Sequence, residues 1–149
     1  MEKSLMTDEQ MSKLLVDMVF IAQTLSRDDF IKRQSGDVLS YTGVKLAAMK
    51  ASLLDLKVSA HQEMLDREVD MMQAKANAYA KFKKEHGATA AGDMKYLDED
   101  FSEAIKKYNH AKVQYERFRS IVADVHDLID IIKSRVIDLQ GARRDERLQ

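Results

Sequence analysis

The feature that most constrains this chain is an apolar repeat in its C-terminal half. Between residues 93 and 140, apolar side chains recur at steps that alternate three and four without a break. This is the a/d pattern of a coiled coil, and it predicts one continuous helix roughly 70 Å long. An apolar stripe of that length needs a partner to cover it. The seam consists of Met94, Leu97, Phe101, Ala104, Tyr108, Ala111, Tyr115, Phe118, Val122, Val125, Ile129, Ile132, Val136 and Leu139.

The composition favours an all-α protein. The 149 residues include no Pro, Cys or Trp and only five Gly, and 33% of them are charged, which is typical of helical rods. The absence of Cys excludes disulfides and thiolate zinc sites. The apolar run at residues 14–21 is interrupted by Asp17, and it is too short for a signal sequence or a membrane span. We therefore expect a cytoplasmic protein.

A second long helix is predicted over residues 41–86. Its stripe first keeps the seam spacing and then drifts, which indicates a partner that changes direction or a helix that loses its supercoil register. The expected stripe residues are Leu46, Met49, Leu53, Leu56 and Ala60, followed by Met64, Leu65, Met72, Ala76 and Tyr79.

The segment between the two helices, residues 87–92, is predicted to be a short loop with a glycine at each end, the first of which suits a helix C-cap. Two helices of similar length joined in this way fold back as an antiparallel hairpin. Folding about the loop brings Lys75 level with Ala104, and Asp66 level with Val113.

Two capping signals predict a smaller helical part at the N-terminus. Thr7 with Gln10 has the form of a capping box, which is followed by a helix of about five turns. Ser26 with Asp29 repeats the signal ahead of a short helix at residues 27–33. The segment 35–43 is then predicted to be a joint.

The predicted organisation has three parts. Residues 1–36 form the N-terminal helices, residues 37–142 form the coiled-coil-like hairpin, and residues 143–149 form a basic flexible tail. The apolar stripe widens towards the C-terminus, so it needs either the first helix or other copies of the chain as an additional partner. We expect both, and hence a homo-oligomer. The expected oligomer contacts are Ile121, Leu128, Ile132, Lys133 and Arg135. Together with Arg143, Arg144 and Arg147, the last two also form a second basic group, for which oligomer contact and DNA binding are equally open roles.

The sequence contains no recognisable catalytic motif. A Gly-rich phosphate loop, a nucleophile elbow and a metalloprotease pair are all absent, and none of the four His has an acid three residues before it, as di-iron bundles require. His126 with Asp130, one turn apart, is the best candidate for metal ligation, but outward heptad positions favour an ordinary solvated face. We predict a protein that is not an enzyme and has no metal or cofactor.

Positive charge is concentrated on both sides of the predicted loop. Residues 71–84 hold four lysines and no acid, and the level segment 104–119 holds five Lys and Arg against Glu116 alone. Cations that follow phosphates, with aromatic faces near the bases, suit a protein that binds single-stranded nucleic acid. The interleaved aromatic residues are Tyr79, Phe82, Tyr108 and Tyr115.

A plainer interpretation accounts for part of this charge. Tyr108 and Tyr115 occupy seam positions, so they are expected in the core. Acids at Glu63, Asp66, Glu68 and Asp70 face Lys112, Arg117 and Arg119 across the hairpin and are expected to form inter-helix salt bridges. The candidate DNA-binding residues that remain are Lys75, Lys81, Lys83, Lys84, Lys106 and Lys107.

Two segments carry a resemblance to a known family: Ala74-Lys75-Ala76 with Tyr79, and Asp130-Ile131-Ile132-Lys133-Ser134-Arg135 with Leu139-Gln140. With these segments placed on a long helical hairpin, the chain resembles the phage recombination-mediator family typified by UvsY. The similarity of layout covers most of the chain from about residue 41 onwards. The resemblance implies a helical hairpin with a C-terminal helix that drives ring assembly. It also implies a protein of the host cytoplasm that binds single-stranded DNA and helps to load a RecA-type recombinase onto strands coated by single-strand-binding protein.

In that family a Lys-x-Arg pair before a Tyr contributes to DNA contact. Lys75 matches the first position here, but Asn77 occupies the second. The second charge of the pair is therefore missing here, and Lys81, Lys83 and Lys84 could supply it from about a turn later.

A second function remains open. A phage or bacterial structural or adaptor protein, for example an anti-defence factor, would present the hairpin to a protein partner. This hypothesis explains the seam and the net charge of −1 equally well, but it does not explain the acid-free run at residues 71–84.

Overall fold

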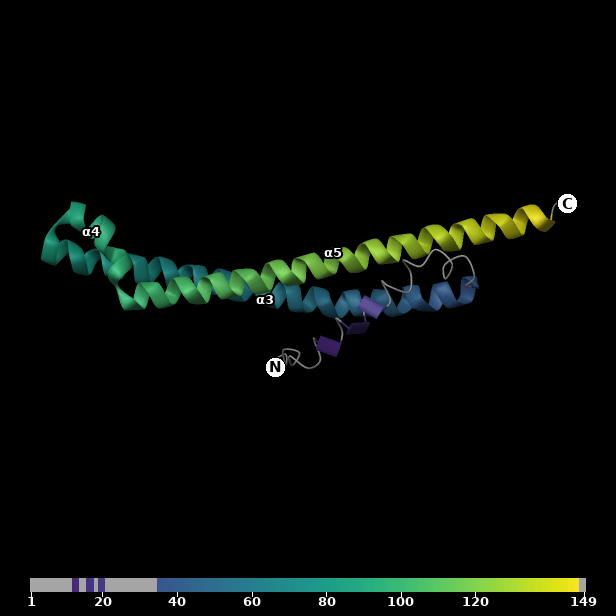
Figure 1. Cartoon of the computed structure of the whole chain (residues 1–149), viewed down its shortest axis with the longest axis horizontal. Helices are drawn as coiled ribbons and strands as arrows, with labels where there is room; N and C mark the ends of the chain where they lie inside the picture. The colour runs from purple at the N-terminus through teal and green to yellow at the C-terminus, as the bar shows by residue number, and fades with distance from the viewer. Residues whose placement is uncertain (1–11, 14–15, 18, 21–34, 148–149) are drawn as a thin grey trace. The chain divides into compact units, whose positions relative to one another are not determined.

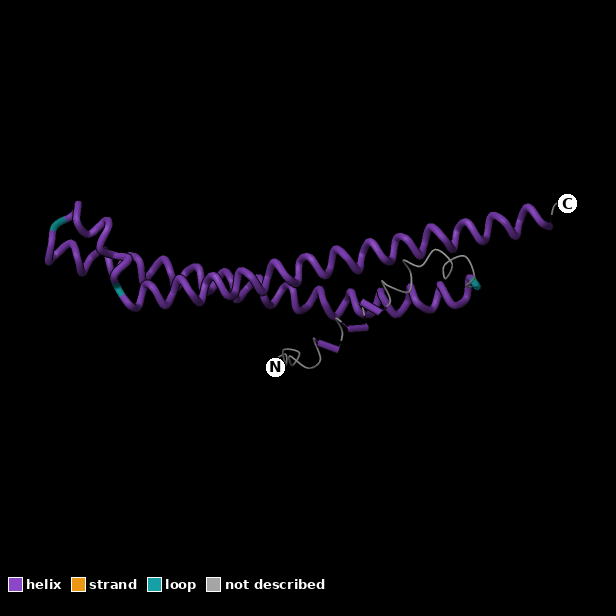
Figure 2. The backbone as a smooth tube through the Cα atoms, in the orientation of Figure 1, coloured by secondary structure: helices purple, strands orange, loops and turns teal. Residues whose placement is uncertain are grey.

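The described part of the chain is helical throughout. The computed structural model describes residues 12–13, 16–17, 19–20 and 35–147, and no strand occurs among them (Figure 2). Its elements are α3 (Gly36–His86), α4 (Ala88–Met94), a 3-10 turn η1 (Lys95–Leu97) and α5 (Glu99–Arg147). The two long helices pack antiparallel as a hairpin, with α4 at the connection (Figure 1). The prediction of an all-α hairpin is confirmed.

The hairpin consists of two compact units. Unit 1 comprises Met1–Leu56 and Ser120–Gln149, and unit 2 comprises Lys57–Arg119. Each unit pairs a stretch of α3 with a stretch of α5 and has its own core. In the described residues, no helix is long and apolar enough to cross a membrane.

The predicted N-terminal helices lie mostly outside the described residues. Within the first predicted helix, the described residues 12–13, 16–17 and 19–20 are helical. The second, at residues 27–33, lies outside them entirely.

The predicted joint at residues 35–43 is wrong, because α3 already begins at Gly36. Ser35 caps the helix: the Val38 N–H donates to its Oγ at 3.4 Å and the Leu39 N–H to its carbonyl oxygen at 3.2 Å. Gly43, which resembles a helix breaker in the sequence, lies where a Cβ would be 3.4 Å from Ile132 Cγ2. The two glycines therefore do not interrupt the helix, and Gly43 allows close contact with α5.

Unit 1 has a core of large aliphatic side chains. Leu39, Leu46, Leu53 and Val125 are almost fully buried, and burial of each such side chain stabilises the fold by about 1.5–3 kcal/mol. The predicted seam of α5 is confirmed in this unit. The other buried members of the unit 1 core are Leu56 on α3 and Ile121, Val122, Ile129 and Ile132 on α5.

Unit 2 has a narrower core, in which small side chains predominate. Ala78, Ala91 and Ala111 are buried together with Phe101 and Phe118.

The predicted drift of the α3 stripe occurs, because the inner face passes from Leu56 through Ala60 to Met64 in two successive steps of four, but some predicted members further along α3 lie on the wrong face. Met72 is 57% exposed and Ala76 is also exposed, whereas Met71 and Ala74 are half-buried and Ala78 is buried. From Met71 to Ala78 the inner face therefore keeps its steps of three and four. The larger side chains of this segment predicted the wrong face of α3 as the buried one, because alanines line the buried face instead.

The predicted loop at residues 87–92 is wrong except at its first residue. Gly87 has φ 82°, in the left-handed region, and its N–H donates to the Lys83 carbonyl at 3.1 Å, as a helix C-cap does. Helix α4 begins immediately at Ala88 and η1 follows it. These extra turns shift the pairing, so that His61 stacks on Tyr115, about three residues from the predicted level.

The last long helix begins later than the seam predicts. Asp98 is extended, α5 starts at Glu99, and Leu97, a predicted seam residue, is 71% exposed. The helix does not extend back to residue 93, because Asp98 adopts an extended conformation and caps the first turn of α5. At the other end, α5 continues through the expected tail to Arg147.

Candidate nucleic-acid interface

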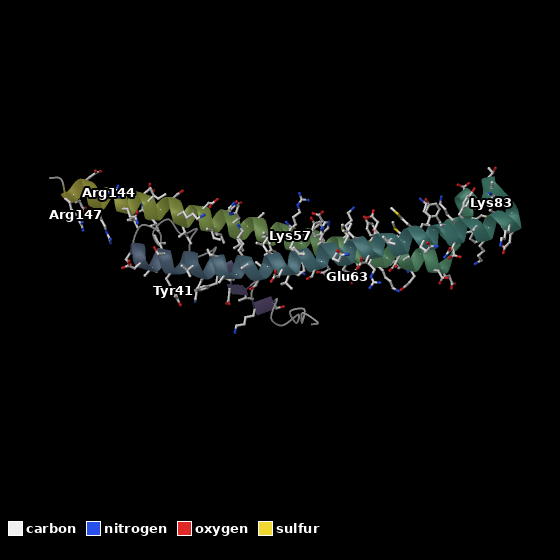
Figure 3. All side chains as sticks on the ribbon, turned by 180° about the vertical axis from the view of Figure 1, so that it is seen from behind. Tyr41, Lys57, Glu63, Lys83, Arg144 and Arg147 are labelled. Atoms are coloured by element: carbon white, nitrogen blue, oxygen red, sulfur yellow. The ribbon has the colours of Figure 1, made fainter. Side chains whose placement is uncertain are left out.

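The last turn of α3 presents exposed positive charge. Lys83 and Lys84 lie there, just before the turn into α4. Figure 3 labels Lys83 at this end of the hairpin. Lys75 on α3 and Lys106 on α5 are exposed too. In the part of the chain that the structure describes, none of these four lysines has an ion pair. All four belong to unit 2, and their charges are available to a ligand.

Lys81 differs from its neighbours, because its Nζ lies 3.1 Å from Asp98 Oδ2. This hydrogen bond is the main cause that raises the pKa of Lys81, and the negative charge of Asp98 adds to it. The Lys81 side chain is still 58% exposed. Of the predicted DNA-binding lysines, it is the one that links the end of α3 to the start of α5.

Asp98 uses both carboxylate oxygens. Its Oδ2 accepts from Lys81, and its Oδ1 accepts from the Phe101 N–H at 3.2 Å. Its backbone carbonyl accepts from the Ser102 N–H at 3.0 Å. The hydrogen bond from Lys81, then that from the Phe101 amide, lowers the pKa of Asp98. Asp98 is therefore an N-cap residue that also holds the preceding helix.

Lys107 is partly neutralised within its own helix. Its Nζ lies 3.5 Å from Glu103 Oε1, one turn earlier, and both side chains are more than half exposed. Exposed pairs of this kind contribute little to stability, about 0.3–0.5 kcal/mol, so Lys107 can exchange its partner for a phosphate at low cost.

The expected inter-helix salt bridges are absent from the described residues. Arg67 pairs within α3, at 3.7 Å from Glu63 and 3.4 Å from Asp70, and Arg119 pairs with Glu116 at 3.5 Å within α5. Consequently Lys112 and Arg117, which the sequence interpretation treated as neutralised, have no ion pair in the described part of the chain. They extend the cationic surface along α5.

The aromatic residues divide into two groups. Tyr108 and Tyr115 are half-buried, and the Tyr115 ring stacks on His61 with centroids 4.6 Å apart. Tyr96 in η1 is instead 60% exposed, and Lys95 Nζ lies 4.9 Å from its ring centroid. Sequence reasoning missed Tyr96 because it lay inside the predicted helix. The adjacent Lys-Tyr pair directly after a Gly-bounded segment was the available signal.

A shallow groove of about 340 Å³ lies beside the Lys81–Asp98 pair. Besides that pair, its polar lining comes from Asp70, Gln73, Asn77 and Asp100. Three carboxylates against one ammonium make this groove unfavourable for a phosphate backbone. A nucleic acid is therefore expected to follow the lysines rather than enter the groove.

The predicted oligomer contacts lie in unit 1. Ile121 and Ile132 are buried, with 8% and 3% exposure, and Leu128 and Arg135 are half-buried. The Arg135 Nε is buried and has no hydrogen-bond partner among the residues that the structure describes. Lys133 is exposed and pairs with Asp130 at 3.2 Å.

The His126 and Asp130 pair is engaged in ordinary surface contacts. His126 Nε2 lies 3.6 Å from Asp130 Oδ2, and its Nδ1 lies 3.1 Å from Lys50 Nζ. Among the described residues, no three His, Asp or Glu side chains come together as metal ligands.

Comparison with protein-family models, with curated proteins and with solved structures gives no match for this chain. The candidate interface therefore rests on the charge and exposure of its own residues and on the resemblance of its sequence segments.

Proposed function

We propose that this protein binds single-stranded DNA as a recombination mediator or accessory protein, without catalysis. The observation that carries the proposal is a set of exposed lysines in unit 2 that have no acidic partner in the described part of the chain. They are Lys75, Lys83, Lys84 and Lys106. The resemblance to UvsY-like mediators supports this function, and it names a RecA-type recombinase and single-strand-binding protein as the further partners.

The binding mechanism follows from the side chains. The lysines neutralise phosphates and release counterions, so affinity decreases with salt. The exposed ring of Tyr96 offers a surface on which a base can stack, and Lys95 beside it adds charge. A homo-oligomer would repeat this modest site, and avidity would then raise the overall affinity without nucleotide or metal.

The decisive test is fluorescence anisotropy of labelled single-stranded and duplex DNA over a series of salt concentrations. We expect preference for the single strand and a salt slope corresponding to several phosphates. The variant Lys83→Glu/Lys84→Glu should weaken binding about 10-fold or more, because each phosphate contact depends on a cation. Lys81 is left unchanged in this variant, since it also holds Asp98.

A matched control has the same change in charge elsewhere on the protein. Arg143→Glu/Arg144→Glu alters two exposed cations in unit 1, on α5, and should leave binding within about twofold. Equal losses in both variants would show that net charge, and not this surface, governs binding. Absence of binding by the wild type at low salt would exclude the proposal.

The second candidate function is an adaptor that binds a protein. A specific observation favours it: α3 exposes several large apolar side chains on the face away from α5, among them Val58, Val69 and Met72. Wild-type protein that ignores DNA but is retained by a protein partner in pull-downs would support this function.

A further inference from the structure

The outer face of α3 carries a second apolar stripe in unit 2. Val58, Leu65, Val69 and Met72 are 67%, 39%, 66% and 57% exposed. Their steps of seven, four and three belong to the heptad pattern, in a frame offset from the inner seam. Ala76, four residues further along, is also exposed.

This stripe needs a cover, and no described residue of unit 2 provides one. By contrast, α5 exposes only one large aliphatic side chain in the same unit, Val113 at 65%. Apart from Tyr96 and Leu97 in η1 and Val113 on α5, the exposed large apolar side chains of unit 2 lie on one face of α3. An isolated exposed side chain is normal at a protein surface, whereas a periodic row of them marks an interaction site.

We propose that this face pairs with the same face of a second copy of the chain, as an antiparallel coiled coil. The core layers then place Val69 of one copy against Met72 of the other, and Leu65 against Ala76. The twofold axis doubles each layer. The proposal does not rest on DNA binding and remains testable if DNA binding fails.

Charge selects this register among the available ones. Glu68 and Lys75 both occupy the flanking g positions of the stripe, and in the described part of the chain neither has an ion pair. In the proposed register Glu68 of each copy faces Lys75 of the other. Sliding one copy by a heptad places Glu68 opposite Glu68 and Asp66 opposite Asp66, which is repulsive. A parallel pair leaves Lys75 facing Ala80.

The same register also places Asp66 opposite Gln73 on the other flank. Each currently contacts a residue of its own helix: Asp66 accepts from Gln62 at 2.9 Å, and Gln73 donates to Asn77 at 3.1 Å. The flanks of the proposed dimer are thus complementary on both sides.

In this register Val58 faces Lys83, so the apolar layers span only residues 65–76, about three turns. The interface therefore falls short of standard size, and we expect a dissociation constant on the order of a hundred micromolar.

Sedimentation of the full chain, from low micromolar to several hundred micromolar, tests the pairing. We expect the mass to rise from monomer to dimer. Val69→Asp should weaken dimerisation about 10-fold or more, because it places a carboxylate in the central layer. Val113→Asp introduces the same change at matched exposure on α5 and should have no effect. Circular dichroism should show unchanged helicity in both variants.

Charge reversal tests the register itself. Glu68→Lys and Lys75→Glu should each weaken dimerisation, by about threefold to 10-fold, since each creates two like-charge contacts. The double variant Glu68→Lys/Lys75→Glu restores opposite charges and should recover wild-type affinity.

Three outcomes would overturn the proposal. The first is a protein that stays monomeric throughout the concentration range. The second is an association that Val69→Asp and Val113→Asp affect equally, or that the double charge reversal fails to restore. The third is a monomer whose melting temperature falls in Val69→Asp, which would show that another segment of the same chain covers the stripe.

Discussion

Asp98 connects the end of α3 to the start of α5 within unit 2. It is 9% exposed, caps α5 through the Phe101 amide, and binds Lys81 at the end of α3. Both interactions require the ionised carboxylate or are strengthened by it. One side chain thus determines where α5 begins and which part of α3 lies beside that start.

Stability should therefore depend on pH through this residue. Its pKa is lower in the folded protein than in the unfolded chain, where it is about 3.9. The ionised form contributes stability above that unfolded pKa, and the contribution is lost as the pH falls through the lower, native pKa. Asp98→Asn should reduce the melting temperature by several degrees at neutral pH and by much less at pH 3, as circular dichroism melts would show.

Asp93→Asn is the matched control, because Asp93 is exposed and has no ion pair in the described residues. It should change the melting temperature little at either pH. If Asp98→Asn lowered the melting temperature equally at neutral and acidic pH, the shape of the Asp98 side chain, and not its charge, would account for its role.

At the scale of elements, the reversal between α3 and α4 depends on one backbone conformation. Gly87 has φ 82° and is the one described residue in the left-handed region. A side chain there clashes with the following carbonyl. The turn is consequently set by a glycine and needs no loop, which is why α4 can begin at once.

Gly87→Ala should destabilise the protein by about 1–3 kcal/mol, because φ 82° with ψ 169° is a backbone conformation that essentially only glycine adopts. Gly92→Ala is the informative comparison, since Gly92 lies inside α4 and a Cβ there has no heavy atom within 4 Å. That change should stabilise the helix by up to about 1 kcal/mol. Thermal melts should shift in opposite directions, and a shift in the same direction would contradict this account of the turn.

At the scale of the whole molecule, dimerisation through α3 would link stability to concentration. Because only the folded chain presents the stripe, mass action raises the melting temperature as protein concentration increases. Melts at low and high micromolar concentrations should differ for the wild type and for Val113→Asp, but not for Val69→Asp. A melting temperature that is independent of concentration in all three proteins would contradict the linkage.

The two long helices were predictable because each extends a heptad pattern over many turns, as the buried run from Phe118 to Ile132 illustrates. The connection was not predictable in the same way. Leu97 fits the apolar period, yet the cap at Asp98 overrides it, since a carboxylate bonded to the first amides starts a helix wherever it lies. Side-chain size likewise favoured Met72 over Ala78 as a core residue. Size is a poor guide to burial where small residues line the contact between two helices.

The candidate interface was predictable as a region but not residue by residue. The excess of lysines is visible in the sequence. Which lysines are engaged depends on partners: Lys81 meets an acid 17 residues away, and Lys107 meets one a single turn away. In the described part of the chain Lys112 and Arg117 have no ion pair, because acids such as Glu63 pair with a residue of their own helix instead.

The alanines that line the inner face of unit 2 have an evolutionary consequence. Ala78 and Ala111 are 2% and 5% exposed, and added methylenes at such buried positions are expected to disturb the packing of the helices. In unit 1 the opposite holds, because shortening Leu46 or Leu53 would leave a cavity. Selection on side-chain size should therefore act in opposite directions in the two units. Substitutions to smaller residues should be rare in the core of unit 1, and substitutions to larger residues should be rare in the core of unit 2.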